Sequence, residues 1–229
     1  MMKDNNKQLK KAMQLPSVPC DNPSGVVVFD VETTGLNPDT DEILQISAID
    51  GDGNTLLNTY VRPYVKEEWP DAAKVNGIAS EMVKDAPYPH EILSIVKGIF
   101  ESTELLISYN GVFDMGFLQH WGIDFSSQKH FDVMREFAPI YGEYREDYGD
   151  YKWQKLTTCA SYYGYEFRAH DSLEDVKATL HCYNHIISGD VPNETTIAAM
   201  KEAERMEADP SKAKTYSSVE EMLGDLLED

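Results

Sequence analysis

Short apolar runs and alternating stretches in the first third of the chain predict β-strands. The run VVVF opens a buried strand over 26–31, and apolar and polar side chains alternate over 42–49. The residues GDGN at 51–54 are typical of a hairpin turn, so a third strand is expected over 55–63. These three strands are predicted to form an antiparallel meander.

From Trp69 onward the pattern is that of helices separated by short strands. The predicted helical segments are 71–80 (stopped by Gly77), a helix capped by Ser80, 89–100, 111–122, a helix ending near Ala138, 155–167 (broken at Gly164) and 172–187. Two more strands are expected at 104–110 and 130–134, and the tyrosine-rich segment 141–154 is expected to be a surface loop. The order predicts an α/β fold, a mixed five-stranded sheet flanked by helices.

Length and composition favour one medium-sized domain with two tails. The chain has 229 residues, of which 41% are hydrophobic. We expect a leader over 1–24, a globular domain over 25–188 and an acidic helical tail over 189–229. The tail contains two helical patterns, at 195–208 and 217–229, and the second has an apolar face. A helix this short is marginal alone, so that face is expected to dock on the globular domain or on a protein partner.

The charge of the chain limits how it can hold a polyanion. The formal net charge is −20, from 40 acids and 20 bases, and residues 24–189 retain 27 of the acids and 12 of the bases. Such a surface repels long nucleic acid, whose affinity depends on phosphate neutralisation. A nucleic-acid substrate must therefore be gripped locally, through metal ions, or delivered by a partner.

Two further absences in the sequence bear on location. No apolar run approaches the length of a membrane span, and the charged N-terminus lacks the apolar core of a secretory signal. The three cysteines are an odd number without CxxC spacing, which argues against a disulfide scaffold or a zinc site. Both patterns predict a cytoplasmic protein.

The candidate chemistry begins where the first strand ends. Asp30 and Glu32 are two residues apart, so on a strand their side chains point to the same face. Burying two like charges side by side is costly unless a cation or a proton lies between them. Thr33, Thr34 and Gly35 then break the strand into a turn. This pattern predicts a strand edge that holds a metal.

Three more residues can complete such a site, although each has a plainer interpretation. Asp114 lies one turn into a predicted helix and alone would be an exposed charge. Asp175 matches a capping box that starts at Ser172, and His170 alone would be an ordinary loop histidine. In a sheet with the first strand central and the fourth beside it, these segments converge with Asp30. Four carboxylates at one point require divalent cations.

Taken together, three motifs carry a family resemblance. They are DVETTGL at 30–36, NGVFDMGFL at 110–118 and H-x4-D from His170 to Asp175. With them the chain resembles the DEDDh group of 3′–5′ exonucleases, the DnaQ-like family of the RNase H-like fold, over residues 25–187. The tyrosine version of the family has Y-x3-D in the third motif. Because Asp171 stands at that position, the tyrosine version is excluded.

The resemblance implies a two-metal phosphodiester hydrolase. Two Mg²⁺ or Mn²⁺ ions would be held by carboxylates, with a general base taking a proton from the attacking water. An imidazole suits that task near neutral pH. By resemblance His170 is the base and Asp30 bridges the two ions, and the full set of metal ligands is Asp30, Glu32, Asp114 and Asp175.

The same turn is expected to hold the substrate. Backbone groups of Thr33, Thr34 and Gly35 would bond the terminal 3′-hydroxyl. By resemblance Leu36 wedges between the last two bases, although ordinary core packing is the alternative. Asn110 matches a position that supports the site. Tyr109 and Asn76 depart from the family pattern, since relatives commonly have histidine at both positions. Trp153 is either a platform on which a base stacks or a residue of ordinary core or surface packing.

Three functions remain open at this point. The first is a 3′–5′ exonuclease that removes nucleoside monophosphates from single-stranded DNA or RNA. The second is an oligoribonuclease-like enzyme for short RNAs, which an acidic surface would tolerate. The third is a non-catalytic adapter that uses its tail, against which the complete residue set argues. A related protein, the proofreading subunit of bacterial replicative polymerases, binds the polymerase through its tail, which makes residues 217–229 a candidate partner-binding segment.

Overall fold

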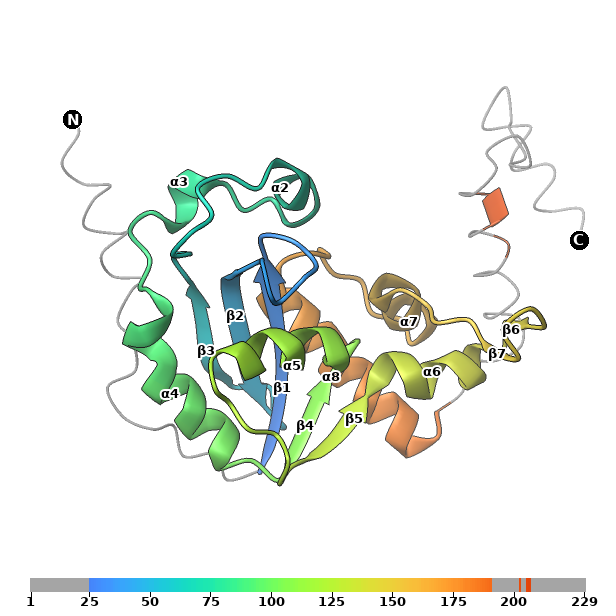
Figure 1. Ribbon diagram of the computed structural model, residues 1–229. Coiled ribbons are helices and arrows are strands. Elements are labelled where there is room, and N and C mark those ends of the chain that lie inside the picture. The colour runs from blue at the N-terminus through green and yellow to red at the C-terminus, as the bar shows by residue number, and fades with distance from the viewer. Residues whose placement is uncertain (1–24, 191–201, 203–204, 207–229) are drawn as a thin grey trace, which may run out of the picture. The chain divides into compact units, whose positions relative to one another are not determined.

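The centre of the fold is a mixed five-stranded sheet with the strand order β3-β2-β1-β4-β5 (Figure 1). The computed structural model describes residues 25–190, 202 and 205–206. The strands are β1 (Val26–Thr33), β2 (Ile43–Asp50), β3 (Thr55–Tyr60), β4 (Leu105–Ser108) and β5 (Lys129–Asp132). Strands β1, β2 and β3 form an antiparallel meander, and β4 and β5 run parallel to β1. The predicted fold class, with β1 central, is confirmed.

Seven helices of the described residues connect and cover this sheet. They are α2 (Pro70–Asn76), α3 (Ser80–Val83), α4 (Pro89–Glu101), α5 (Gly111–His120), α6 (Val133–Tyr141), α7 (Leu156–Tyr162) and α8 (Ser172–Ser188). Gly77 ends α2 in a left-handed conformation, as predicted. The prediction that Ser80 caps α3 is wrong. Ala79 has the extended cap conformation, and the Ser80 hydroxyl bonds the Glu81 carboxylate instead of a backbone amide.

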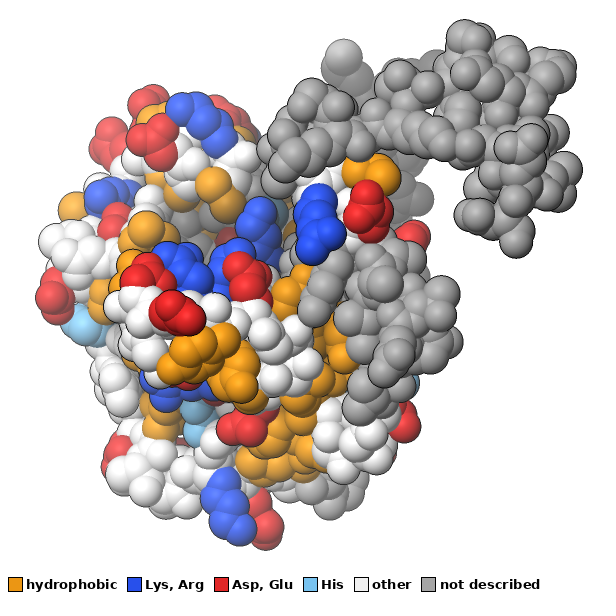
Figure 2. All heavy atoms as spheres, turned by 90° about the vertical axis from the view of Figure 1, so that its right-hand side faces the viewer, with side chains coloured by type: hydrophobic (Ala, Val, Ile, Leu, Met, Phe, Trp, Pro, Cys, Tyr) orange, Lys and Arg blue, Asp and Glu red, His pale blue; other side chains and the backbone are white. Residues whose placement is uncertain are grey.

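The segment 141–154 is more ordered than the predicted surface loop. It contains a small antiparallel hairpin of β6 (Tyr144–Arg145) and β7 (Asp150–Tyr151). Both strands are exposed, and the ion pair between Arg145 and Asp147 lies in the turn. The hairpin lies on the right of Figure 1, and Figure 2 shows acidic and basic side chains intermingled on that side. Polar composition did not exclude strand pairing, because cross-strand contact of Tyr144 and Tyr151 supports it.

The alternation of side chains along β1 determines what each face of the sheet meets. Val27, Phe29 and Val31 belong to the core cluster shared with α4 and α5, where the Phe29 and Phe100 rings meet edge to face at 5.1 Å. Residues at even positions point to the opposite face, which α8 covers. Asp30 and Glu32 are therefore directed toward α8.

The upper part of β1 is unpaired on one side. Strand β4 pairs only with Val26–Val28, so β1 continues beyond the end of β4. Helix α5 begins directly after β4 and fills the space beside this free edge. Its first residue is Gly111, where a Cβ would collide with the Ser108 hydroxyl and the His130 ring. Only glycine allows α5 to start this close to β4 and β5.

Contacts divide the chain into two units, Met1–Asp190 and Val191–Asp229. The predicted leader, 1–24, lies outside the described residues, as does the predicted helix at 217–229. Within the helix predicted at 195–208 only 202 and 205–206 are described, and they are helical. The predicted division into leader, domain and tail stays a prediction. No helix in the described part of the chain is both long and apolar enough to cross a membrane. Cys159 and Cys182 are buried free thiols.

Candidate active site

Asp30 and Glu32 lie at the upper end of β1, on the side that faces α8. The pairing of β1 with β2 shifts register between Glu32 and Thr33, and such irregularities re-aim side chains at strand ends. The carboxylate atom Asp30 Oδ2 is buried and has no hydrogen-bond partner in the described structure. The Ser172 hydroxyl donates to the Asp30 carbonyl at 3.2 Å, which fixes the first residue of α8 against the strand.

Asp114 reaches the same place from the other face of the sheet. It lies in the first turn of α5 and is only 2% exposed, so it is not an ordinary surface charge. Its Oδ1 accepts a hydrogen bond from the Val31 backbone N–H at 3.1 Å. This N–H belongs to the part of β1 that extends past β4, so the carboxylate replaces a missing strand neighbour.

His170 and Asp175 complete the group from the start of α8. The ligand atoms of Glu32, His170 and Asp175 all lie within 4.8 Å of one another. Asp175 Oδ2 accepts a hydrogen bond from the His170 backbone N–H at 3.2 Å, while its buried Oδ1 has no partner in the described part of the chain. His170 is exposed and has a left-handed backbone, with φ 65°.

The predicted capping box at the start of α8 is wrong. Asp171 is the N-cap, and its carboxylate accepts the Leu173 N–H at 3.2 Å. Because Asp171 takes the capping role, Asp175 is free to turn toward Glu32 and His170. Ser172 is likewise not a cap, since its hydroxyl bonds β1. The local pattern allowed either Asp171 or Ser172 to cap, and only the tertiary position of β1 decides between them.

The acids of this site hold their protons unusually tightly. Burial, followed by the neighbouring charges of Asp114, Glu32 and Asp175, raises the pKa of Asp30 well above its usual value. Burial also raises the pKa of Asp114 strongly. Burial together with the charge of Asp175 raises the pKa of Glu32 to about 7, and burial raises that of Asp175 to about 7. Ionising all four acids together therefore requires compensating positive charge.

The residues present fit divalent cations. Two buried carboxylate oxygens, Asp30 Oδ2 and Asp175 Oδ1, have no protein partner among the described residues, which is costly unless another group bonds them. The donors are carboxylates with one imidazole and no thiolate, a set that suits Mg²⁺ or Mn²⁺. The positions that would hold such ions are Asp30, Glu32, Asp114 and Asp175.

Metal-free protein is expected to lose stability as the pH rises from about 4 to above 7. Unfolded, Glu32 and Asp175 ionise near 4.5 and 3.8, but folded they ionise near pH 7, so the folded state holds extra protons throughout this window. The summed effect on the free energy of unfolding is on the order of several kcal/mol. Urea unfolding in EDTA across this pH range measures it. Added Mg²⁺ should restore stability at high pH, and a flat profile in EDTA would contradict the assignment of buried, protonated acids.

The turn after β1 is built as a rigid unit. Thr33 and Thr34 are buried, and the Thr34 N–H donates to the Glu42 carbonyl at 2.8 Å. The Thr34 hydroxyl donates to Asp41 at 3.2 Å. Leu36 follows and is 84% exposed, so the alternative of core packing does not hold for this residue. The turn is fixed by these hydrogen bonds, and it presents the apolar side chain of Leu36 to solvent.

Gly35→Ala is expected to lower kcat/KM by up to about 100-fold, with little loss of stability. A Cβ at this residue would lie 2.5 Å from the Asp41 carboxylate, which must move and release Thr34. Such small displacements near a reacting centre typically cost up to about 100-fold in rate. Steady-state kinetics on a single-stranded oligonucleotide and a thermal melt measure both effects. Gly98→Ala, where the added Cβ meets nothing within 4 Å, is the matched control. Equal kinetics for both variants would show that the turn is not part of the site.

Two residues outside the three motifs, Asn76 and Asp132, support the site. The Asn76 amide donates to the Thr33 carbonyl at 3.2 Å, and its hydrogen bond to Glu32 favours the ionised carboxylate. The departure from histidine at this position therefore still supports the site. The buried Asp132 accepts the Asn110 backbone N–H at 3.2 Å and caps α6. Asn110 itself is the left-handed N-cap of α5, and its side chain makes no capping bond. The position of Asp132 between a predicted strand and a predicted helix was the sequence signal that could have identified it as a helix cap.

Comparison with known proteins identifies relatives by sequence. The model of the family RNase_T, described as exonuclease, matches residues 27–183. An uncharacterized exonuclease, CP81, of Escherichia phage 186 is 33% identical over 174 residues, which cover 71% of this chain and 88% of the phage protein. A PolC-type DNA polymerase III of Caldanaerobacter subterraneus is 32% identical, with 67% of this chain and 11% of the polymerase covered. The epsilon subunit of Pasteurella multocida DNA polymerase III is 33% identical over 110 residues, which cover 44% of this chain and 43% of the subunit.

Solved structures share the fold. Exonuclease I of Escherichia coli, in its zinc-bound complex with single-stranded DNA, superposes with a TM-score of 0.59 at 20% identity. The match covers 72% of this chain and 40% of that enzyme. A second complex of the same enzyme, with a dA16 oligonucleotide, gives a TM-score of 0.58 at 19% identity, with 76% and 42% of the two chains covered. At this identity the likeness shows the RNase H-like arrangement of sheet and helices.

Proposed function

Since the chain belongs to the exonuclease family that the RNase_T model describes, we propose that it is a 3′–5′ exonuclease. Its substrate is the 3′ end of single-stranded DNA or RNA, and its products are nucleoside 5′-monophosphates. The observation that carries this proposal is the convergence of Asp30, Glu32, Asp114 and Asp175, with an exposed His170 beside them. Acids from three separate segments, with Asp114 buried and the other three partly buried, serve no packing purpose that apolar residues would not serve better.

Phosphodiester hydrolysis needs an activated water and relief of the charge that develops on the phosphate. Divalent ions bound by the four acids would offset the charge on the phosphate and on the leaving 3′ oxygen. In this proposal His170 takes the proton from the attacking water, since it is the one exposed base in the group. The bond from its backbone N–H to Asp175 holds the loop in place. Leu36 contacts the last base from the solvent side of the turn.

The direct test is digestion of 5′-labelled single-stranded DNA and RNA with Mg²⁺ or Mn²⁺. We expect a ladder that shortens from the 3′ end, release of nucleoside monophosphates, and complete inhibition by EDTA. Endonucleolytic products, or attack from the 5′ end, would overturn the proposed direction. A labelled RNA dinucleotide in the same assay tests the oligoribonuclease-like function, which the acidic surface would tolerate. No cleavage of any substrate would favour the adapter function.

A further inference from the structure

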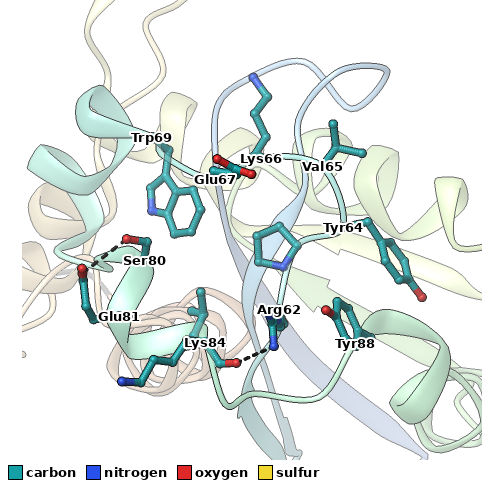
Figure 3. A pocket seen from close by; sticks show the side chains of 12 residues that line it. Arg62, Tyr64, Val65, Lys66, Glu67, Trp69, Ser80, Glu81, Lys84 and Tyr88 are labelled. Atoms are coloured by element: carbon teal, nitrogen blue, oxygen red, sulfur yellow. Dashed lines mark hydrogen bonds between the residues drawn. The ribbon is translucent and has the colours of Figure 1, made fainter.

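A pocket of about 380 Å³ opens between the loop that follows β3 and helix α3 (Figure 3). Its lining combines basic and aromatic side chains, namely Arg62, Lys66, Lys84, Tyr64, Trp69 and Tyr88. Trp69 is buried, and its indole N–H donates to the Ile78 carbonyl at 2.6 Å. This hydrogen bond holds the indole in place on one side of the pocket. The other five basic and aromatic side chains of the lining are at least partly exposed to solvent.

The pocket is tied to the turn of the candidate active site. The Glu42 carboxylate accepts hydrogen bonds from the backbone N–H groups of Tyr64, Val65 and Lys66, with the last at 2.8 Å. Lys66 also pairs with Asp41 at 3.1 Å. Asp41 also accepts a hydrogen bond from the Thr34 hydroxyl, and the backbone carbonyl of Glu42 accepts one from the Thr34 N–H. One continuous hydrogen-bonded network therefore runs from Thr34 to the wall of the pocket.

Tyr64 presents an aromatic face beside this network. Its ring stacks on Tyr88 with centroids 5.1 Å apart and an interplanar angle of 7°, and it lies nearly parallel to His90. Tyr64 is 57% exposed, so the part of its ring that does not contact Tyr88 or His90 is open to solvent. Val65 is 81% exposed on the same loop. Backbone bonds to Glu42 hold both residues, so an incoming base would meet a preorganised surface.

Two cations of the pocket are unpaired in the described structure. Arg62 lies over the Tyr88 ring at 5.0 Å and donates to the Lys84 carbonyl at 2.8 Å, but neither Arg62 nor Lys84 pairs with a described acid. Glu67 and Glu81 also line the pocket, so its charge is mixed. The ring and the carbonyl orient the guanidinium without neutralising it. Arg62 and Lys84 are therefore available to contact a phosphate, although Glu67 and Glu81 line the same pocket.

We propose that this pocket and the outer face of Tyr64 bind the single strand on the 5′ side of the scissile nucleotide. Arg62 and Lys84 contact backbone phosphates, and Tyr64 stacks on a base. Binding of single strands combines a basic groove with aromatic faces, and it is tolerant of sequence because every base can stack. Duplex substrates are disfavoured, since their bases are stacked inside the helix. This inference rests on the proposed exonuclease function and names how that same site holds its substrate.

The test compares a long oligothymidylate with a thymidine dinucleotide, which in this proposal is held at the acids and the turn after β1 alone. For Tyr64→Ala we expect the KM for the long substrate to rise by about 5- to 150-fold, the range for loss of one stacking contact. Lys84→Gln should also raise this KM, through loss of a phosphate contact. Hydrolysis of the dinucleotide should be unchanged. Tyr148→Ala is the matched control, because Tyr148 is 77% exposed on the β6–β7 hairpin and also lies beside an arginine. It should leave both substrates unaffected.

A binding measurement keeps the two proposals separable. Fluorescence anisotropy of labelled oligothymidylate in Ca²⁺ needs no turnover, and Lys84→Gln should reduce the salt slope of log Kd by about 0.7, the value for one phosphate contact on a single strand. Equal losses on the long and short substrates, an unchanged salt slope, or an effect of Tyr148→Ala as large as that of Tyr64→Ala would overturn the pocket assignment. Absence of cleavage by the unmodified protein, with the binding differences intact, would overturn the exonuclease function alone.

Discussion

Asp30→Asn is expected to lower kcat by at least about 10³-fold while making the metal-free protein more stable. Loss of a partner one shell away from a metal typically costs 10- to 100-fold, and a direct ligand should cost more. Asparagine retains the volume of the side chain and is neutral without taking up a proton. Folding then no longer has to protonate this carboxyl, a cost that burial and the neighbouring acids impose on Asp30 by raising its pKa. Opposite changes in activity and stability identify a functional site rather than a structural one.

The experiment pairs turnover with thermal melts in EDTA. We expect the melting temperature of metal-free Asp30→Asn to rise by about 2–6 °C, which corresponds to roughly 1–2 kcal/mol for a chain of this size. Added Mn²⁺ should then stabilise the variant less than the parent. Asp85→Asn, an exposed acid outside the site, is the matched control and should change neither quantity. A destabilised Asp30→Asn, or one that keeps its turnover, would contradict the assignment.

His170→Asn should lower kcat by about 10²- to 10⁴-fold with unchanged metal binding. This range is the usual contribution of a positioned general base. Asparagine is the informative replacement because His170 has φ 65°, a left-handed conformation that asparagine tolerates and alanine does not. The backbone N–H that bonds Asp175 is retained in every variant except proline. Loss of turnover can then be assigned to the imidazole.

Calorimetric titration with Mn²⁺ and a thermal melt accompany the kinetics. His170→Ala should lose the same turnover and also melt a few degrees lower, since alanine in this conformation costs roughly 1–2 kcal/mol. His120 is an exposed histidine at the end of α5 that pairs with Asp39, and the control variant His120→Asn should behave as the parent. If His170→Asn lost Mn²⁺ binding in parallel with turnover, the histidine would be a metal ligand and not the base.

Much of the fold could be predicted because local signals agreed with the topology. The apolar run of β1, the alternation over 42–49 and the glycine turn after Asp50 predict the meander, and the strand order then follows from short connections. The spacing of Asp30 and Glu32 predicts a shared face, which the alternation of burial in β1 agrees with. These features depend on neighbours in the sequence, so the sequence carries them.

Other features depend on contacts between distant segments. Asp171 and Ser172 were equally good caps for α8, and only the position of the Asp30 carbonyl decides which of them caps. The link from Glu42 to Tyr64 spans 22 residues and has no sequence signature. The hairpin of β6 and β7 escaped prediction because each strand has only two residues. The motifs identified the acids, whereas the network that supports the turn after β1 had to come from the structure.

The free edge of β1 has a practical consequence for anyone who wants to capture the protein with an intact strand bound. Asp114 both belongs to the acid cluster and accepts the Val31 N–H that β4 is too short to reach. Truncation to alanine would leave that N–H buried and unbonded, which typically costs 1–3 kcal/mol. Asp114→Asn keeps an oxygen for this bond and removes the charge. It is therefore the inactive variant to choose for crystals of a trapped complex.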